Sequence, residues 1–289
     1  MTTTTTRPNS TTAYGVNLFI LSVCLFLFSP RHSFAKFVSS VDADLSIKKV
    51  LVLPLKDNLK GIYSNQLNAP FIETLQSDNQ WTISAAPSNE KTDLEDLLEN
   101  AKTTKLILEK NKVDAIVSGK MMKGPSGLKI SLAIFAGVAG LPLAIQESEY
   151  INEFETKEIQ NILLHQVQKL KEKIPYSGVV LSRSKASGKN TVTLNIGSYH
   201  NLRPEALVSV IQILQVKRHP KFKFVVDSEK EIIGRIRITK VEEYLSFGEI
   251  EFEREVNVVQ PYMKLIPIQF VSYPKLQSNT TTQISGAEI

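Results

Sequence analysis

Residues 191–210, TVTLNIGSYHNLRPEALVSV, decide the fold of the second half of the chain. The first six residues alternate polar and apolar side chains, which is the period-two pattern of a half-buried strand. Gly197 interrupts the pattern, and Pro204 restricts the backbone as it does in turns. Residues 207–214 are again rich in β-forming side chains. The stretch therefore predicts two strands joined by a turn region, which is a building block of a small β-barrel.

Residues 176–270 continue this pattern and are predicted to form a small all-β domain, an SH3-like barrel. Short apolar runs recur roughly every ten residues with turn residues between them, as in barrels and sandwiches. In the longest run Ile232, Ile236 and Ile238 are expected to share the inward face. The further predicted strands are 178–181, 222–226, 231–241, 247–252 and 263–268.

Residues 48–175 show a mixed pattern that predicts an α/β domain of two or three layers, so the predicted fold class of the chain is α+β. The expected order of elements is β-α-β-α-β-β-β-α. One helix is expected to begin at Asn68, with Pro70 in its first turn. A second helix is expected to open at Thr92 and Glu95, which have the spacing of a capping box, and to run to about Asn111.

Two short motifs in this half resemble the α/β domain at the amino end of TolB. They are VLVLPL at residues 50–55 and VDAIVSG at residues 113–119. The same architecture occurs in CsgG, in LpoB and in the middle domain of flagellar assembly protein T. The resemblance implies a non-enzymatic protein that scaffolds or regulates part of the cell envelope.

The second half resembles the carboxy-terminal domain of flagellar assembly protein T. The matching segments are VTLNIG, LRPEALVSV, IIGRIRITKV and SFGEI. The family pattern places three glycines around the turn. Gly197 matches the first, whereas Asn201 and Glu205 occupy the other two positions. Asn tolerates the left-handed backbone conformation, and Glu is not expected to adopt it. The two resemblances cover about residues 48–268 and imply a component of a flagellar basal-body ring.

Residues 1–35 are predicted to be a signal peptide that starts with a disordered, Thr-rich segment. The apolar run at 16–28 is shorter than the roughly 20 residues of a membrane-spanning helix and suits the core of a signal. Ser33 and Ala35 are the small residues of a cleavage site, so cleavage is expected after Ala35. Two alternatives stay open. The run remains as an inner-membrane anchor, or the LSVC sequence that ends at Cys24 is lipidated as in a lipoprotein.

Composition excludes several classes of function. The chain has 289 residues, of which 42% are hydrophobic and 22% charged, as in ordinary globular proteins. The first 35 residues contain two arginines and no acidic residue, so the rest carries 32 basic and 29 acidic residues. This net charge of +3 is too low for a nucleic-acid-binding surface. A single cysteine excludes a disulfide framework and a cysteine-based zinc site. We therefore expect no cofactor, no metal and no nucleic-acid partner.

The basic stretch KRHPKFK at residues 217–223 is the candidate partner-binding site. Its charged side chains are Lys217, Arg218, Lys221 and Lys223. They would contact an acidic partner, phospholipid head groups or a cell-wall polymer. The alternative is an ordinary solvated hairpin loop. An exposed edge of the barrel is the second surface expected to bind partners.

Three other patterns carry less weight. The S-x-x-K spacing of penicillin-binding enzymes occurs at Ser182, but it recurs at four other serines and lacks a K-T-G partner, so it is set aside.

The apolar run at 128–143 would either insert into a membrane after oligomerisation, as the resemblance to CsgG implies, or form the buried centre of the sheet. The tail at 277–289 is polar and without periodicity, so disorder is expected there.

The main hypothesis is a non-enzymatic, exported envelope protein that acts as a structural or assembly component of a flagellar basal-body ring. The alternative is a periplasmic or lipoprotein-like regulator, or a secretion component, that binds proteins through its α/β domain. Expected partners are other envelope proteins, including basal-body components, or further copies of the chain. The expected location is the periplasm or the outer membrane, with the inner membrane as the alternative if residues 16–28 remain. Membrane contact is expected only through this amino-terminal segment, and only if it stays uncleaved.

Overall fold

A computed structural model describes residues 39–77, 80–87, 90–152, 155–186 and 188–268. These residues belong to one compact unit. The predicted signal peptide, its cleavage at Ala35, the alternative lipidation at Cys24 and the polar tail lie outside them. Among the described residues, no helix combines the length and apolar character needed to cross a membrane.

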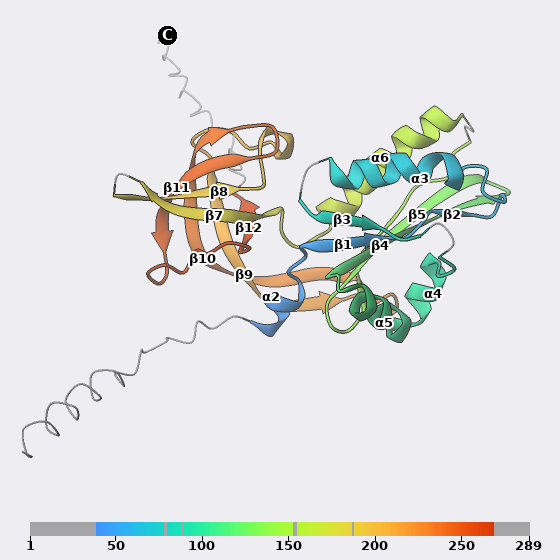
Figure 1. Cartoon of the computed structure of the whole chain (residues 1–289), viewed down its shortest axis with the longest axis horizontal. Helices are drawn as coiled ribbons and strands as arrows, with labels where there is room; N and C mark the ends of the chain where they lie inside the picture. Colours follow the sequence, from blue (N-terminus) through green and yellow to red (C-terminus); the bar gives the residue numbers. More distant parts are fainter. Residues whose placement is uncertain (1–38, 78–79, 88–89, 153–154, 187, 269–289) are drawn as a thin grey trace, which may run out of the picture. The chain divides into compact units, whose positions relative to one another are not determined.

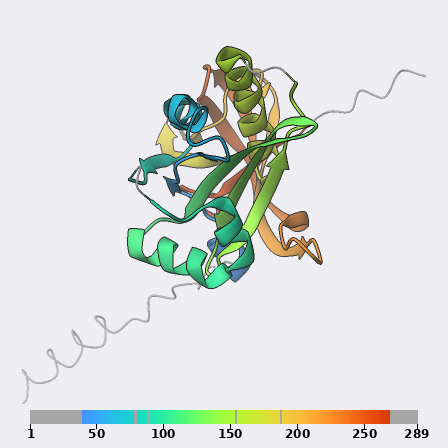
Figure 2. The same ribbon diagram turned by 90° about the vertical axis from the view of Figure 1, so that its right-hand side faces the viewer.

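The first half of the chain folds into a mixed sheet with helices on both faces (Figures 1 and 2). The strand order is β3-β1-β4-β5-β6, with β2 beside β4. β1 runs parallel to β3 and β4, whereas β4, β5 and β6 form an antiparallel meander. Helices α3 and α6 cover one face, and α4 and α5 cover the other, which makes three layers. The elements are α2 (Ser40–Asp44), β1 (Lys49–Val52), β2 (Lys56–Asp57), α3 (Ser64–Gln76), β3 (Thr82–Ala85), α4 (Leu94–Glu99), α5 (Ala101–Asn111), β4 (Ala115–Gly124), β5 (Gly127–Ala136), β6 (Leu141–Glu147) and α6 (Thr156–Glu172).

The second half forms a closed antiparallel barrel (Figure 1). Its strand order is β10-β11-β8-β7-β12-β9, and the pairing of β9 with β10 closes the ring. The α+β fold class is thus confirmed. The expected exposed barrel edge is wrong, because every strand of a closed ring has two neighbours. The elements are β7 (Gly178–Ala186), β8 (Lys189–Leu194), the 3₁₀ helix η1 (Ser198–His200), β9 (Leu207–Arg218), β10 (Val225–Val241), β11 (Ser246–Glu253) and β12 (Lys264–Pro267).

The turn between β8 and β9 is held in a conformation that suits glycine. Gly197 is needed for close packing, since a Cβ atom there would lie 2.3 Å from the carbonyl oxygen of Glu242. Asn201 has a φ of 60° and Glu205 a φ of 64°, so both are left-handed. The expectation that Glu205 avoids this conformation is wrong. Its N–H donates to the Ile238 carbonyl at 2.8 Å, and this bond holds the residue in place.

Helix α3 begins at Ser64, four residues before the predicted start, and Pro70 lies inside it. The cause is Asp57, a residue of β2. Burial opposes ionisation of this carboxyl, but backbone N–H donors outweigh burial and lower its pKa. A carboxylate that satisfies free N–H groups favours a helix start. The N–H groups that Asp57 accepts belong to Leu59, Gly61, Tyr63 and Ser64.

The single helix predicted after Thr92 is in fact two helices, α4 and α5, which meet at Asn100. Asp93, rather than Thr92, caps α4, and it exchanges hydrogen bonds with Asp96 in a capping box. The Asn100 side chain accepts two N–H groups in the first turn of α5. Because Asn is also a strong capping residue, it starts a new helix where the pattern predicted continuation.

Strand β10 replaces two predicted strands and carries β-bulges. One bulge lies between Ile232 and Gly234. A bulge adds one residue to a strand and so reverses the facing of the side chains beyond it. Ile233 is therefore buried with Ile236 and Ile238, whereas Ile232, which was predicted to face inward, is 45% exposed.

Strand β9 contributes to two cores. Val208 and Val210 belong to the barrel core, whereas Ile211 and Ile213 belong to the core under α3 and α6. The ring of Tyr176, in the linker after α6, packs in that same second core. The barrel and the α/β sheet therefore share buried surface along β9.

Lys264 of β12 is fully buried at this junction. Its Nζ lies 3.0 Å from Oδ2 of Asp42 and donates to the Asp42 carbonyl at 2.6 Å and to Ser46 Oγ at 2.9 Å. Asp42 Oδ1 in turn accepts the N–H of Ile213 at 2.8 Å. Burial lowers the pKa of Lys264, and the Asp42 carboxylate opposes that shift. The pair fastens α2 to both β9 and β12.

Replacing Lys264 with methionine is expected to lower the free energy of unfolding by about 3–5 kcal/mol, because the Asp42 carboxylate would stay largely buried without its cation. Urea denaturation at neutral pH measures this loss. The matched control Lys240→Met removes an exposed pair with Glu242 and is expected to change stability by less than about 0.5 kcal/mol. The double variant D42N/K264M should recover part of the loss, since both charges are gone. A K264M protein as stable as the wild type would contradict the role given to the pair.

The effect of Lys264 is also expected to depend on pH. Because its pKa is lowered in the folded state, the unfolded chain binds this proton more tightly than the folded protein does. The unfolding free energy of the wild type should therefore rise, relative to K264M, as the pH increases from neutral toward the ordinary lysine value of 10.5. Denaturation curves of both proteins across this range test the sign.

Replacing Glu205 with glycine is expected to stabilise the protein by about 0.5–1 kcal/mol. Glycine avoids the roughly 1–2 kcal/mol cost of a left-handed residue but loses part of that gain to the entropy of the unfolded chain. Glu205→Ala keeps the Cβ atom and removes only the exposed contact with Arg237, 3.5 Å away, so it serves as the control. A melting temperature of E205G below that of E205A would contradict this argument about the backbone conformation.

Candidate functional site

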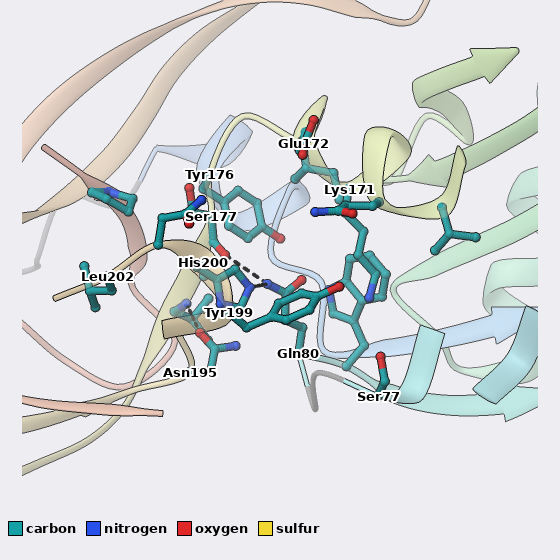
Figure 3. Close-up of a pocket in the computed structure, with 18 of the residues that line it drawn as sticks. Ser77, Gln80, Lys171, Glu172, Tyr176, Ser177, Asn195, Tyr199, His200 and Leu202 are labelled. Atoms are coloured by element: carbon teal, nitrogen blue, oxygen red, sulfur yellow. Dashed lines mark hydrogen bonds between the residues drawn. The ribbon is translucent and has the colours of Figure 1, made fainter. Parts of the chain in front are cut away.

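A cleft of about 1190 Å³ lies where helices α3 and α6 face the turns and the last strand of the barrel (Figure 3). The residues before β3 and the linker after α6 form its floor and side. The segments that line it are parts of α3 and α6, residues 80–81, residues 176–179, residues 195–207 and residues 266–268. Segments from both halves of the chain thus converge on one space.

Gln80 joins the two halves of the protein across this cleft. Its Nε2 donates to the Ser177 carbonyl at 3.0 Å and lies 3.0 Å from Nε2 of His200. The other ring nitrogen, Nδ1, lies 3.4 Å from the N–H of Gly197, so the imidazole tautomer decides whether Nε2 donates or accepts in its contact with Gln80. Figure 3 shows the Gln80 amide between Ser177 and His200. The side chain therefore connects the start of β3 with the linker and with the barrel turn.

Aromatic rings and long polar side chains complete the walls. Lys171 Nζ lies 5.1 Å from the ring centre of Trp81, which is almost fully buried. The half-exposed ring of Tyr199 lies 5.5 Å from His200 and 5.4 Å from Tyr244. Amide groups and amphipathic rings bind polypeptide segments well, because they offer both hydrogen bonds and apolar contact. The lining is thus suited to holding a chain segment.

Tyr176, which lines the cleft, has a structural role. Burial raises the pKa of its phenol far above the ordinary value. The hydroxyl donates to the Leu45 carbonyl at 3.1 Å and lies 3.4 Å from the N–H of Ile47. The neutral phenol therefore positions the segment between α2 and β1.

One edge of the α/β sheet is open beside the cleft. Within the part of the chain that the structure covers, β3 pairs with β1 alone. The N–H groups of Thr82 and Ala86 donate to carbonyl oxygens at the two ends of β1, at 2.8 and 2.9 Å. Backbone groups alternate in direction along a parallel strand, so those of Ile83 and Ala85 point away from β1. An unpaired row of this kind is a template for another strand.

The opposite edge of the same sheet, strand β6, is protected. Lys173 Nζ donates to the Ile145 carbonyl at 2.5 Å, and the Arg218 guanidinium donates to the Pro142 carbonyl at 2.8 Å. Pro142 itself has no N–H to offer. Charged side chains and proline are the usual means of blocking an edge strand. Among the described residues, the edge at β6 is thus blocked and the edge at β3 is open, and the open edge adjoins the cleft.

The basic residues predicted as a binding site lie outside the cleft, around the turn of the β9–β10 hairpin. Lys217 pairs with Asp227 at 3.0 Å, and both side chains are exposed. Arg218 is half-buried against Pro142, and this burial lowers its pKa. Lys221 lies 5.2 Å from the ring centre of Phe222, and Lys223 occupies a left-handed turn position. Arg218 thus has a structural role, and the three lysines remain at the surface.

Sequence reasoning did not find the cleft residues. Gln80 is far in the sequence from the adjacent residues Tyr199 and His200, and the three form no motif. His165 of α6 is exposed and also lines the cleft. No local signal links these side chains, because the packing of the barrel against α3 and α6 brings them together. Among the described residues, no group of three or more His, Cys, Asp or Glu side chains could hold a metal ion.

No protein-family model and no curated protein matches this chain. A comparison with solved structures finds partial similarities. TolB from Acinetobacter baumannii is 9% identical over 72% of this chain and 50% of its own, with a TM-score of 0.33. A PelC dodecamer from Paraburkholderia phytofirmans is 9% identical over 44% of this chain and 87% of its own, with a TM-score of 0.30. A lipoprotein from Neisseria meningitidis is 14% identical over 42% and 94%, with a TM-score of 0.27. Each similarity covers only part of the chain and concerns the path of the backbone.

Replacing Gln80 with alanine is expected to lower the free energy of unfolding by about 1–2 kcal/mol, because the Ser177 carbonyl and His200 lose their shared hydrogen-bond partner. Hydrogen exchange should quicken at the backbone amides of residues 198–202, which this contact holds against the sheet. Gln168→Ala, an exposed cleft residue on α6, is the control and should alter neither measurement. Unchanged exchange in Q80A would show that the bridge does not hold the turn.

Proposed function

We propose that this chain is a non-enzymatic, exported envelope protein that acts as a structural or assembly component. It binds a partner polypeptide by adding a strand to β3, with the cleft holding the residues that follow. The observation that carries the proposal is the contrast between the two sheet edges. β6 is blocked by Lys173, Arg218 and Pro142, whereas β3 has no second neighbouring strand among the residues that the structure describes.

Two further features support this function. The Asp42–Lys264 pair and the shared core along β9 make the walls of the cleft a fixed surface, which lowers the entropy lost on binding. The amino-terminal apolar run and the small residues before position 36 support export. At the finer level, the resemblance of both halves to flagellar assembly protein T supports a place in a flagellar basal-body ring. The alternative, a periplasmic or lipoprotein-like regulator, would use the same edge.

Strand addition is tested by changing Ala85, an exposed residue whose N–H points away from β1. Ala85→Pro removes that outward donor and leaves the pairing with β1 in place. Ala85→Ser keeps the N–H and is the matched control. A photo-crosslinking residue at Thr82, also exposed, should give one adduct of constant mass in cells. We expect the adduct yield to fall about five- to tenfold in A85P and to stay unchanged in A85S. Equal yields in the two variants, with equal melting temperatures, would refute strand addition.

The flagellar assignment has its own test. The full chain with a carboxy-terminal tag is followed through detergent extraction of flagellar basal bodies. Co-purification, together with loss of swimming on deletion, is the expected result. If the protein stays in the periplasmic fraction while the Thr82 adduct still forms, the flagellar assignment is wrong. The proposal of an envelope protein that binds a partner strand would then still hold.

A further inference from the structure

The turn of the β9–β10 hairpin concentrates positive charge. Residues 217–226, KRHPKFKFVV, contain four basic residues and no acidic one. Asp227 follows directly and pairs with Lys217 at 3.0 Å. Lys221 and Lys223 are exposed, and neither takes part in an ion pair within the described chain. A net positive charge therefore remains at the surface of this turn, which we call the hairpin tip (residues 217–223).

The shape of the hairpin tip is held by its own hydrogen bonds. The Arg218 guanidinium donates to the Lys223 carbonyl at 2.8 Å as well as to Pro142. His219 Nδ1 lies 3.3 Å from the N–H of Lys221 and 3.1 Å from that of Phe222, and it accepts from both. The Lys223 N–H donates to the His219 carbonyl at 2.9 Å. These contacts present the lysines in a fixed arrangement, so little order has to be gained on binding.

An aromatic ring stands among these charges. Phe222 is 52% exposed, although its ring lies 5.1 Å from that of His219. The ammonium group of Lys221 lies 5.2 Å from the centre of the Phe222 ring. A protruding aromatic side chain flanked by lysines matches the membrane interface, where the ring enters the acyl boundary and the ammonium groups meet phosphates. An acidic protein or polymer would require the charges but not the exposed ring.

We propose that the hairpin tip binds the surface of membranes that contain anionic phospholipids. Lys221 and Lys223 would contact the head-group phosphates, and Phe222 would enter the interface. This inference goes beyond the proposed function and does not rest on strand addition at β3. In the alternative in which residues 16–28 remain, the hairpin tip adds a second membrane contact, and two weak contacts of this kind hold a protein at a membrane far better than one does.

The test is co-sedimentation of the exported protein, purified as the cell produces it, with vesicles. One set contains equal amounts of phosphatidylglycerol and phosphatidylcholine, and the other contains phosphatidylcholine alone. We expect binding to the anionic set, weakened by salt. K221Q/K223Q should bind about 25-fold more weakly, at about fivefold for each lysine near the surface. F222S should bind about tenfold more weakly, because the ring no longer leaves water.

The matched control is K102Q/K110Q, which removes the same charge from exposed positions of α5. It should bind anionic vesicles nearly as well as the wild type. Equal losses in the two double variants would assign binding to overall charge and overturn the proposal. The protein is also tested for binding to polyglutamate. If it binds polyglutamate as tightly as anionic vesicles, and if F222S weakens neither interaction, the partner is an acidic polymer and the membrane proposal is overturned. All the substituted side chains are exposed, so equal melting temperatures verify that the variants fold.

Discussion

The buried ion pair between Asp42 and Lys264 is the interaction on which the rest of the structure depends. A fully buried ammonium group is tolerated only when its donors find partners, and here a carboxylate, a carbonyl and a hydroxyl supply them. The same carboxylate accepts the N–H of Ile213 in β9. One pair thus joins α2, β9 and β12. Since β9 also contributes to both cores, the barrel and the sheet act as one body, and the cleft between them has fixed walls.

Fixing the barrel against the sheet has different consequences at the two sheet edges. The β9–β10 hairpin reaches β6, where Arg218 covers a carbonyl, and Lys173 after α6 covers another. The barrel turn reaches the start of β3 through the Gln80 bridge but leaves the outward backbone groups of that strand unpaired among the described residues. A sheet that is blocked at one edge and open at the other is protected against random association while keeping one place for a specific strand.

Local patterns failed wherever a contact distant in sequence, or a second strong local preference, competed with them. Asp57 starts α3 early because its carboxylate reaches four N–H groups that follow it, so the proline spacing at Asn68 misplaced the start. Asn100 divides the predicted long helix because it is itself a capping residue. The bulge near Ile232 turns that one side chain outward and buries Ile233 in its place, whereas Ile236 and Ile238 face inward as predicted. The bulge depends on the pairing with β9, which the sequence of the strand does not show. The barrel edge expected from the sequence does not exist, because the pairing of β9 with residues 225–237 of β10 closes the ring.

The sequence by itself determined the α+β class, the succession of strands in the second half, the strand–turn–strand at residues 191–210 and the basic stretch at 217–223. These follow from periodicity, turn residues and charge, which act between near neighbours and can be read directly. The tertiary structure alone decided that Arg218 is a structural residue, that Glu205 is left-handed, and that Gln80, Tyr199 and His200 meet in a cleft. It also decided which sheet edge stays open. The physical reason is that each outcome depends on contacts between residues distant in the sequence. Glu205 is held by a bond to Ile238 within the barrel, whereas the other outcomes depend on where the barrel packs against α3, α6 and β6, which is set by buried contacts between residues more than a hundred positions apart.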